Sequence, residues 1–198
     1  PVGWSTKTVN RSGPESSTAS TSTPRIPCST ALVISLVSCR SLSWTPAMTA
    51  PALPRVFLLH GQDRRVGFGH PWAYSNEIKM DAAAKAIPPG ALAQLVRVAG
   101  KPIGVGTFNS KTLIAFRVFS RDADARVDRA FIGRRLRAAL ALRDKLFATP
   151  FYRLIHAEAD GLPGLVIDRF NDVCVVQAGT AGIETLLPEI MAALDDVL

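Results

Sequence analysis

Cysteine is scarce in this sequence, and long apolar runs are missing from it. Cys28, Cys39 and Cys174 are far apart, form no C-x-x-C pair and are odd in number, which argues against a disulfide framework. We therefore expect a reducing, cytoplasmic setting. The three histidines have no metal-ligand spacing with cysteines or carboxylates, so we expect no metal site. No apolar run approaches the roughly 18 residues that a membrane span needs, so we expect no membrane partner.

The charge is positive but modest where the chain is expected to fold. The formal net charge is +7, and 47% of the residues are hydrophobic, which is typical of a globular protein. Residues 1–50 hold four Lys or Arg against one acid, whereas residues 51–198 hold nineteen against fifteen. This excess in the second part permits a polyanionic partner without requiring one.

The N-terminal quarter differs from the rest of the chain in composition and in hydrophobic pattern. It is crowded with Ser, Thr and Pro, has no hydrophobic period, and contains one apolar patch, Ala31 to Val37. Such a composition cannot bury enough apolar surface to offset its ordering entropy. We expect residues 1–53 to be a disordered or non-native N-terminal extension, since Met48 opens the ordinary-looking part. A targeting segment is the remaining interpretation.

Short strands with Gly and Pro turns follow, and they predict a small β-barrel over residues 54–121. "RVFLLHG" reads as a strand, and a turn at Pro88 to Gly90 precedes two strands that flank a tight turn at Ala99 to Lys101. Leu113 to Ser120 reads as a further strand. The pair Gly104 and Gly106 is interpreted as part of a hairpin strand rather than a cofactor loop.

The pattern changes to α+β over residues 122–198, which need not form a complete domain. Asp128 is a plausible N-cap for a helix that Pro150 ends. Three strands are expected next, with turns at Asp160 to Gly164 and at Asn171-Asp172. The segment from Gly182 to the last residue shows a helical apolar stripe. The order is therefore helix, three strands, helix.

The stretch "GHPWAYSNEI", Gly69 to Ile78, reads as a shaped surface loop rather than a core strand, because proline removes a donor and its polar side chains are costly to bury. One interpretation is an RNA-facing surface in which cations bind phosphates and aromatic planes stack on bases. The other is that the aromatics fill the barrel's end while polar side chains bond nearby backbone. The candidate residues are Arg64, Arg65, His70, Trp72 and Tyr74.

Arg117 is a further candidate, because a charge among apolar strand residues needs a partner. An RNA phosphate and an acid such as Glu77 are both open as that partner. The arginines Arg134, Arg135 and Arg137 of the expected helix are interpreted as a solvated face.

Two stretches together resemble a known family. "GHPWAYSNEI" followed by "PPG", "GVGTFN" and "IAFRVFS" resembles the N-terminal PUA-type domain of bacterial class I S-adenosylmethionine-dependent methyltransferases that make 5-methylcytosine in large-subunit ribosomal RNA. "YRLIHAEADGLPGLVIDRFNDVCVVQ", Tyr152 to Gln177, resembles the signature of that family's central domain. The resemblance covers about residues 55–198 and is most specific in "EADGLPGLVIDR".

The resemblance implies a PUA-like β-barrel followed by an α+β domain. In the family a Rossmann-like domain with the cofactor loop and the nucleophilic cysteine comes next, and nothing in this sequence matches it. The chain is therefore expected to be the N-terminal half of the enzyme, docking ribosomal RNA and inactive alone. S-adenosylmethionine would be the cofactor of the full-length enzyme, with none bound by this chain. The alternative is a stand-alone PUA-type RNA-binding module without catalytic activity.

The acidic motif and the third cysteine are interpreted as architectural. Glu158 and Asp160 would share a strand face, but they belong to a turn that Asp160 caps and that Gly161 and Gly164 allow through positive φ. Asp168 and its neighbouring arginine are expected to pair with the family's missing domain. Cys174 lies inside a strand without a base beside it, so we expect it only to pack.

Overall fold

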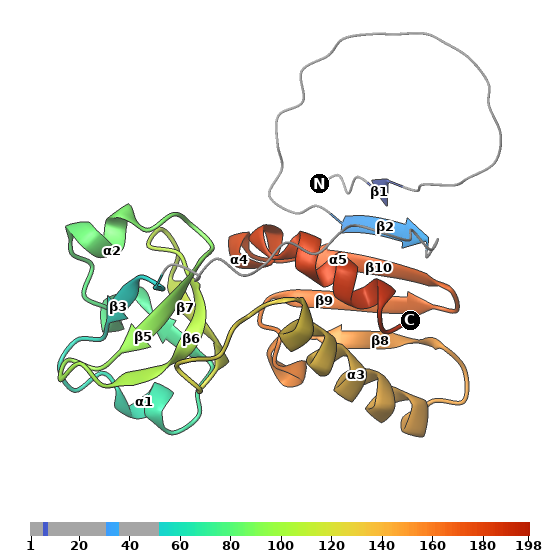
Figure 1. The fold of residues 1–198 in the computed structure, drawn as a ribbon, viewed down its shortest axis with the longest axis horizontal. Helices are drawn as coiled ribbons and strands as arrows, with labels where there is room; N and C mark the ends of the chain where they lie inside the picture. The colour runs from blue at the N-terminus through green and yellow to red at the C-terminus, as the bar shows by residue number, and fades with distance from the viewer. Residues whose placement is uncertain (1–5, 8–30, 36–51) are drawn as a thin grey trace, which may run out of the picture.

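The computed structural model describes residues 6–7, 31–35 and 52–198, and it contains two β-sheets with the longer helices packed on the second (Figure 1). The predicted extension over residues 1–53 lies mostly outside the described residues and stays a prediction. Two backbone segments within it are described, β1 (Thr6–Lys7) and β2 (Ala31–Ser35), and β2 pairs antiparallel with a strand of the second sheet.

The first sheet has five strands in the order β3-β5-β6-β7-β4. Their bounds are β3 (Arg55–Phe57), β4 (Trp72–Tyr74), β5 (Ala91–Val96), β6 (Pro102–Phe108) and β7 (Ile114–Ser120). Three short helical segments join them: α1 (Arg64–Gly67), η1 (Ser75–Glu77) and α2 (Ala82–Ala86).

This sheet curls into a half-barrel. The ladders β4–β7, β5–β6 and β6–β7 each contain a register shift, which bends and twists the strands. Beyond β3, Leu58 forms a bridge with Ile78, and this bridge ties together the two ends of the sheet. Glycine allows the tightest curve, because a Cβ on Gly106 would lie 1.9 Å from the carbonyl oxygen of Arg117.

The second unit is a five-stranded sheet in the order β1-β2-β10-β9-β8, antiparallel except for the parallel pair β1–β2, and helices cover one of its faces (Figure 1). Its strands β8 (Phe151–His156), β9 (Leu165–Phe170) and β10 (Val173–Ala178) lie next to one another, with β8 at the edge. The 3₁₀ turn η2 (Ala157–Asp160) connects β8 to β9. The helices are α3 (Arg129–Leu146), α4 (Ala181–Thr185) and α5 (Leu187–Asp195).

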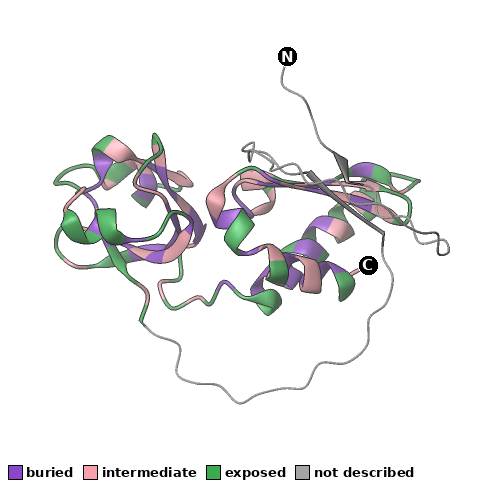
Figure 2. Cartoon of the chain, turned by 90° about the horizontal axis from the view of Figure 1, so that it is seen from above, coloured by how far each residue is buried: buried purple, intermediate pink, exposed green. Residues whose placement is uncertain are grey.

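Two apolar clusters hold these units. One lies inside the half-barrel around Phe108 and Phe116. The larger lies between α3, α5 and the second sheet, and buried residues gather there on the helix faces that meet the strands (Figure 2). Val105 of β6 and Phe119 of β7 belong to the larger cluster, so the two units share buried apolar surface.

The fold confirms the expected α+β class, and it departs from the expected elements in three places. The half-barrel contains two short helices that the sequence did not predict, α1 and α2. The stretch interpreted as a loop contains strand β4, whose backbone pairs with β7; Ala73 is buried, while the side chains of Trp72 and Tyr74 remain half-buried. The last helix is two helices, since Pro188 cannot donate a backbone hydrogen bond and restarts the helix at its first turn.

Candidate nucleic-acid interface

Arg65 sits at the centre of a network at one end of the half-barrel. Its Nε and Nη2 donate to the carboxylate of Glu77 at 3.2 and 2.6 Å, and its guanidinium carbon lies 4.4 Å from the centre of the Tyr74 ring. The hydrogen bond to Glu77 raises the pKa of Arg65. Glu77 is only 7% exposed and also accepts the backbone N–H of Tyr74 at 2.7 Å. Most of the charge of Arg65 is therefore matched inside the protein.

His70 and Trp72 complete this network. A ring nitrogen of His70 lies 3.2 Å from Nη1 of Arg65, and Nδ1 accepts the backbone N–H of Trp72 at 3.2 Å. The two rings meet edge to face with their centres 5.6 Å apart. The indole Nε1 of Trp72 donates to Oε1 of Glu158 at 2.8 Å. Trp72 therefore joins the half-barrel to the second unit, a role that neither interpretation of the sequence included.

Arg64 stands apart from these residues. It is exposed on α1, and no ion pair holds it among the described residues. The structure thus brings four of the six candidate residues into one network and leaves Arg64 and Arg117 outside it. Contact of any of the six with RNA stays a prediction.

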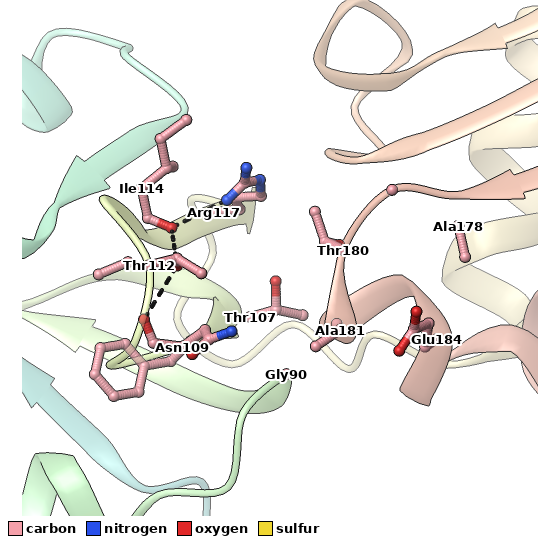
Figure 3. Close-up of a pocket in the computed structure, with 14 residues that line it drawn as sticks. Gly90, Thr107, Asn109, Thr112, Ile114, Arg117, Ala178, Thr180, Ala181 and Glu184 are labelled. Carbon is pink, nitrogen blue, oxygen red and sulfur yellow. Dashed lines mark hydrogen bonds between the residues drawn. The ribbon is translucent and has the colours of Figure 1, made fainter. Parts of the chain in front are cut away.

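Arg117 lies beside Trp72 in the β4–β7 ladder, and its side chain enters the space between the two units (Figure 3). Its Nη1 donates to the carbonyl oxygen of Ile114 at 3.1 Å, while its Nε is enclosed without a partner. Glu77 pairs with Arg65 instead, so the proposed Arg117–Glu77 pair is wrong. Burial lowers the pKa of the Arg117 guanidinium, and the charge of Glu158 opposes that shift.

A groove of about 250 Å³ receives this side chain. One wall comes from β6, β7 and the turn between them, and the other from the end of β10 and the start of α4 (Figure 3). The hydroxyl side chains on the walls are Thr107, Thr112 and Thr180. No sequence motif predicts this groove, because its two walls come from segments far apart in the chain.

Glycines allow the two walls to approach closely. A Cβ on Gly182 would lie 2.5 Å from Cβ of Thr107, and a Cβ on Gly90 would lie 2.5 Å from the backbone of Ala181. Gly90 also has a φ of +85°, which side chains rarely adopt. Close backbone packing at these glycines therefore sets the distance between the two walls of the groove.

A second hollow of about 330 Å³ lies at the same junction. Two arginines line it, Arg121 just after β7 and Arg135 of α3. Gly69 and Pro71, which precede β4, also line it. Both arginines are exposed, and no ion pair involves either one in the described part of the chain. Arg135 is exposed, in agreement with the solvated face predicted for this helix, but helical spacing did not reveal the hollow that it lines.

The acidic motif serves the architecture, as predicted. Gly161 and Gly164 have φ values of +71° and +84°. Asp160 accepts the backbone N–H of His156 at 2.6 Å and forms a bidentate ion pair with Arg143 at 2.7 Å. Glu158 and Asp160 lie in η2 rather than a strand, so they bind different partners.

Asp168 and Arg169 find their partners within this chain, contrary to the expectation of a partner domain. Asp168 pairs with Arg153 at 2.9 Å across the β8–β9 ladder. Arg169 donates to the hydroxyl of Tyr152 at 3.0 Å. Cys174 packs as predicted, since it is 3% exposed and burial raises the pKa of its thiol.

Two searches of the described residues bear on other kinds of site. None of the helices described combines the length and the apolar character needed to cross a membrane. Over the same residues, no three histidine, cysteine or carboxylate side chains cluster in a way that could hold a metal ion.

Comparison with known proteins finds similarities for the half-barrel and for the chain as a whole. Residues 56–121 match the family model of the PUA-like domain. Over 157 residues the chain is 36% identical to a ribosomal RNA large subunit methyltransferase I of Klebsiella pneumoniae subsp. pneumoniae, a match that covers 76% of this chain and 38% of that protein. The corresponding protein of Aliivibrio fischeri is 35% identical over 143 residues, covering 70% of this chain and 35% of its own length.

Solved structures agree on the fold. A protein assigned as a SAM-dependent methyltransferase from Streptococcus mutans superposes with a TM-score of 0.61 at 15% identity, covering 73% of this chain and 38% of that one. At this identity the likeness concerns the fold alone. The half-barrel thus matches a PUA-like domain and precedes a small α+β unit, in a chain that spans about 38% of the length of the ribosomal RNA methyltransferases it matches.

Proposed function

We propose that this chain docks ribosomal RNA as the N-terminal part of an S-adenosylmethionine-dependent methyltransferase that forms 5-methylcytosine. The observation that carries the proposal is a set of three arginines at the junction of the two units that form no ion pair with any carboxylate in the described part of the chain. These are Arg117, Arg121 and Arg135. Guanidinium groups gathered where two units meet suit the phosphates of a nucleic acid that touches both.

The similarity to ribosomal RNA methyltransferases supports the choice of RNA. Arg64 on α1 adds an exposed cation to the same domain. The network of Arg65, His70, Trp72 and Tyr74 has a supporting role in this proposal, because it fixes β4 and the bridge to Glu158.

Catalysis is assigned to the longer protein rather than to the residues described here. S-adenosylmethionine would supply the methyl group there. Gly104 and Gly106 do not form an open cofactor loop, since a Cβ on Gly104 would lie 2.1 Å from the carbonyl oxygen of Ser120. Cys174 is buried with a raised thiol pKa, which disfavours the thiolate that a nucleophile needs.

RNA binding tests the proposal. Labelled fragments of large-subunit ribosomal RNA are titrated with the chain at several salt concentrations, and fluorescence anisotropy gives the affinity and its salt dependence. The double variant Arg121→Gln, Arg135→Gln is expected to bind roughly 10-fold or more weakly, and to reduce the salt slope by about 2 if each arginine contacts one phosphate. Both side chains are exposed, so the fold is expected to tolerate the change.

The matched control is Lys85→Gln on α2, which lies on the side of the half-barrel away from the second unit (Figure 1). It removes one positive charge without touching the junction and should leave affinity nearly unchanged. Failure of the unaltered chain to bind any of the fragments would overturn the proposal. Calorimetric titration with S-adenosylhomocysteine is expected to show no micromolar site. A clear site would contradict the proposal that the cofactor binds outside this chain.

A further inference from the structure

We propose that the groove between β7 and the segment Ala178–Gly182 is a phosphate-binding site for the RNA backbone, with Arg117 as its cation. The inference rests on the proposed function and deepens it, because it assigns one phosphate contact to one site that both units build. Each unit supplies one wall of the site, so neither unit contains the whole site.

The first argument is the unfinished hydrogen bonding of Arg117. Its guanidinium makes one bond, from Nη1 to the carbonyl oxygen of Ile114, and its Nε is enclosed with no acceptor. Within residues 52–198 no carboxylate lies within ion-pair distance of Arg117, and Oε1 of Glu158 already accepts from Trp72. A desolvated cation with unmet donors costs free energy, and a phosphate offers it two acceptor oxygens at once.

The second argument is the polarity of the walls. Thr180 faces Arg117 across the groove (Figure 3), and its Oγ1 accepts from the backbone N–H of Ile183 at 3.3 Å, which leaves the hydroxyl proton free to donate. Glu184 is the acid that lines the groove, and its carboxylate lies on the far side of Thr180 from Arg117 (Figure 3). The end of the groove at Arg117 therefore offers donors to an anion.

The third argument is that contacts within the protein hold the two walls of the groove in place. Close backbone packing at Gly90 and Gly182 and the Trp72–Glu158 hydrogen bond hold the walls together. At roughly 30 Å³ for each water molecule, its volume of about 250 Å³ accommodates a phosphate group with several waters. A ligand would not have to assemble the site, which lowers the entropic cost of binding.

The position of Arg121 favours a polymer over a small anion. It follows Arg117 by four residues along the end of β7, which places the two Cα atoms on the order of 13 Å apart at the rise of an extended strand. Arg117 lines the groove and Arg121 lines the second hollow, so an anion seated in either one meets only one of these arginines, whereas successive phosphates of one RNA strand can meet both. The groove and the second hollow would then hold different phosphates of the same strand.

Two measurements test the inference. In ¹H–¹⁵N spectra, titration with inorganic phosphate, and separately with a short single-stranded RNA, is expected to shift the amides of Thr107, Gly179 and Thr180, while chloride at equal ionic strength does not. In Arg117→Gln these shifts should vanish. The same variant should bind ribosomal RNA fragments roughly 10-fold more weakly with a salt slope reduced by about 1, and Lys85→Gln should show neither loss.

The results of these experiments distinguish failure of the groove site from failure of the proposed RNA docking. RNA affinity unchanged in Arg117→Gln, but lost in Arg121→Gln, Arg135→Gln, would overturn the groove site and leave RNA docking intact. Absence of phosphate-dependent shifts at the three amides in the unaltered chain would also overturn it, and that measurement does not depend on whether the variant folds. Absence of all RNA binding would instead remove the proposed function.

Discussion

The indole Nε1 of Trp72 and Oε1 of Glu158 lie 2.8 Å apart although 86 residues separate them in the chain. Trp72 belongs to a strand of the PUA-like half-barrel, and Glu158 to the turn between two strands of the second unit. This hydrogen bond forms next to Arg117 in the β4–β7 ladder, so it fixes the units where the proposed phosphate groove opens.

Replacement of the indole tests that bond. Trp72→Phe keeps an aromatic ring but removes the N–H, so a half-buried carboxylate loses its donor. We expect the free energy of unfolding, measured by urea denaturation, to fall by about 1–2 kcal/mol. Glu158→Gln should cost less, because its amide oxygen still accepts. Strictly additive effects of Trp72→Phe and Glu158→Ala in a double-mutant cycle would show that the two side chains are not coupled.

The buried carboxylate of Glu77 provides a second prediction. Glu77→Gln leaves one oxygen for three donors, two on Arg65 and one on the backbone of Tyr74. Because Arg65 is one-third exposed and water replaces part of the lost interaction, we expect a loss of about 1–2 kcal/mol in denaturation experiments. Glu184→Gln is the exposed control and should change stability by less than about 0.5 kcal/mol. Equal effects of the two variants would be inconsistent with a structural role for the Arg65 network.

The close approach of the two units predicts opposite results for one chemical change at two glycines. Gly182→Ala would place a Cβ 2.5 Å from Cβ of Thr107, and we expect a destabilisation of about 1–3 kcal/mol. Gly133→Ala in α3 meets only the flexible end of Arg137 at 3.3 Å and should be neutral or stabilising by up to about 1 kcal/mol. Thermal unfolding of both variants checks this, and a harmless Gly182→Ala would mean that the junction is looser than described.

The N-cap of α2 predicts a dependence on pH. The Asp81 carboxylate accepts the backbone N–H of Ala84 at 2.9 Å, and this bond lowers the pKa of Asp81 in the folded state. The stabilisation from a carboxylate with a lowered pKa is fully present above the unfolded pKa of about 3.9 and is lost as pH falls through the folded value.

Asp81→Asn keeps an oxygen acceptor that does not titrate, so it isolates this contribution. We expect the unaltered chain to have a higher melting temperature than the variant at pH 6, and this difference to shrink progressively as the pH falls below about 4. A gap that stays constant over this range would show that Asp81 does not titrate with unfolding.

Features that depend on neighbours in the chain could be predicted from the sequence. Asp128 caps α3 by accepting the backbone N–H of Phe131 at 2.9 Å, as its position before a helical pattern indicated. The turn glycines Gly161 and Gly164 adopt the positive φ that their motif required. The same local reasoning failed at Pro188, where the apolar stripe continued although the backbone hydrogen bonding could not.

Pairing between distant charges could not be predicted in this way. Glu77 was one of two open partners for Arg117, and only the fold, which places Glu77 at the end of η1, brings it beside Arg65 instead. Asp168 was expected to pair beyond this chain, yet the register of β8 against β9 places Arg153 beside it.

The α+β class and the positions of most strands could be predicted from the amino-acid sequence, because periodicity, caps and turns are set by residues a few positions apart; the PUA-like segment was predicted from its resemblance to a known family. Only the three-dimensional arrangement shows which arginines lack an ion-pair partner among the described residues and where they gather. That outcome depends on how a curled sheet docks against a second unit, a geometry fixed by glycine contacts and buried side chains far apart in the chain.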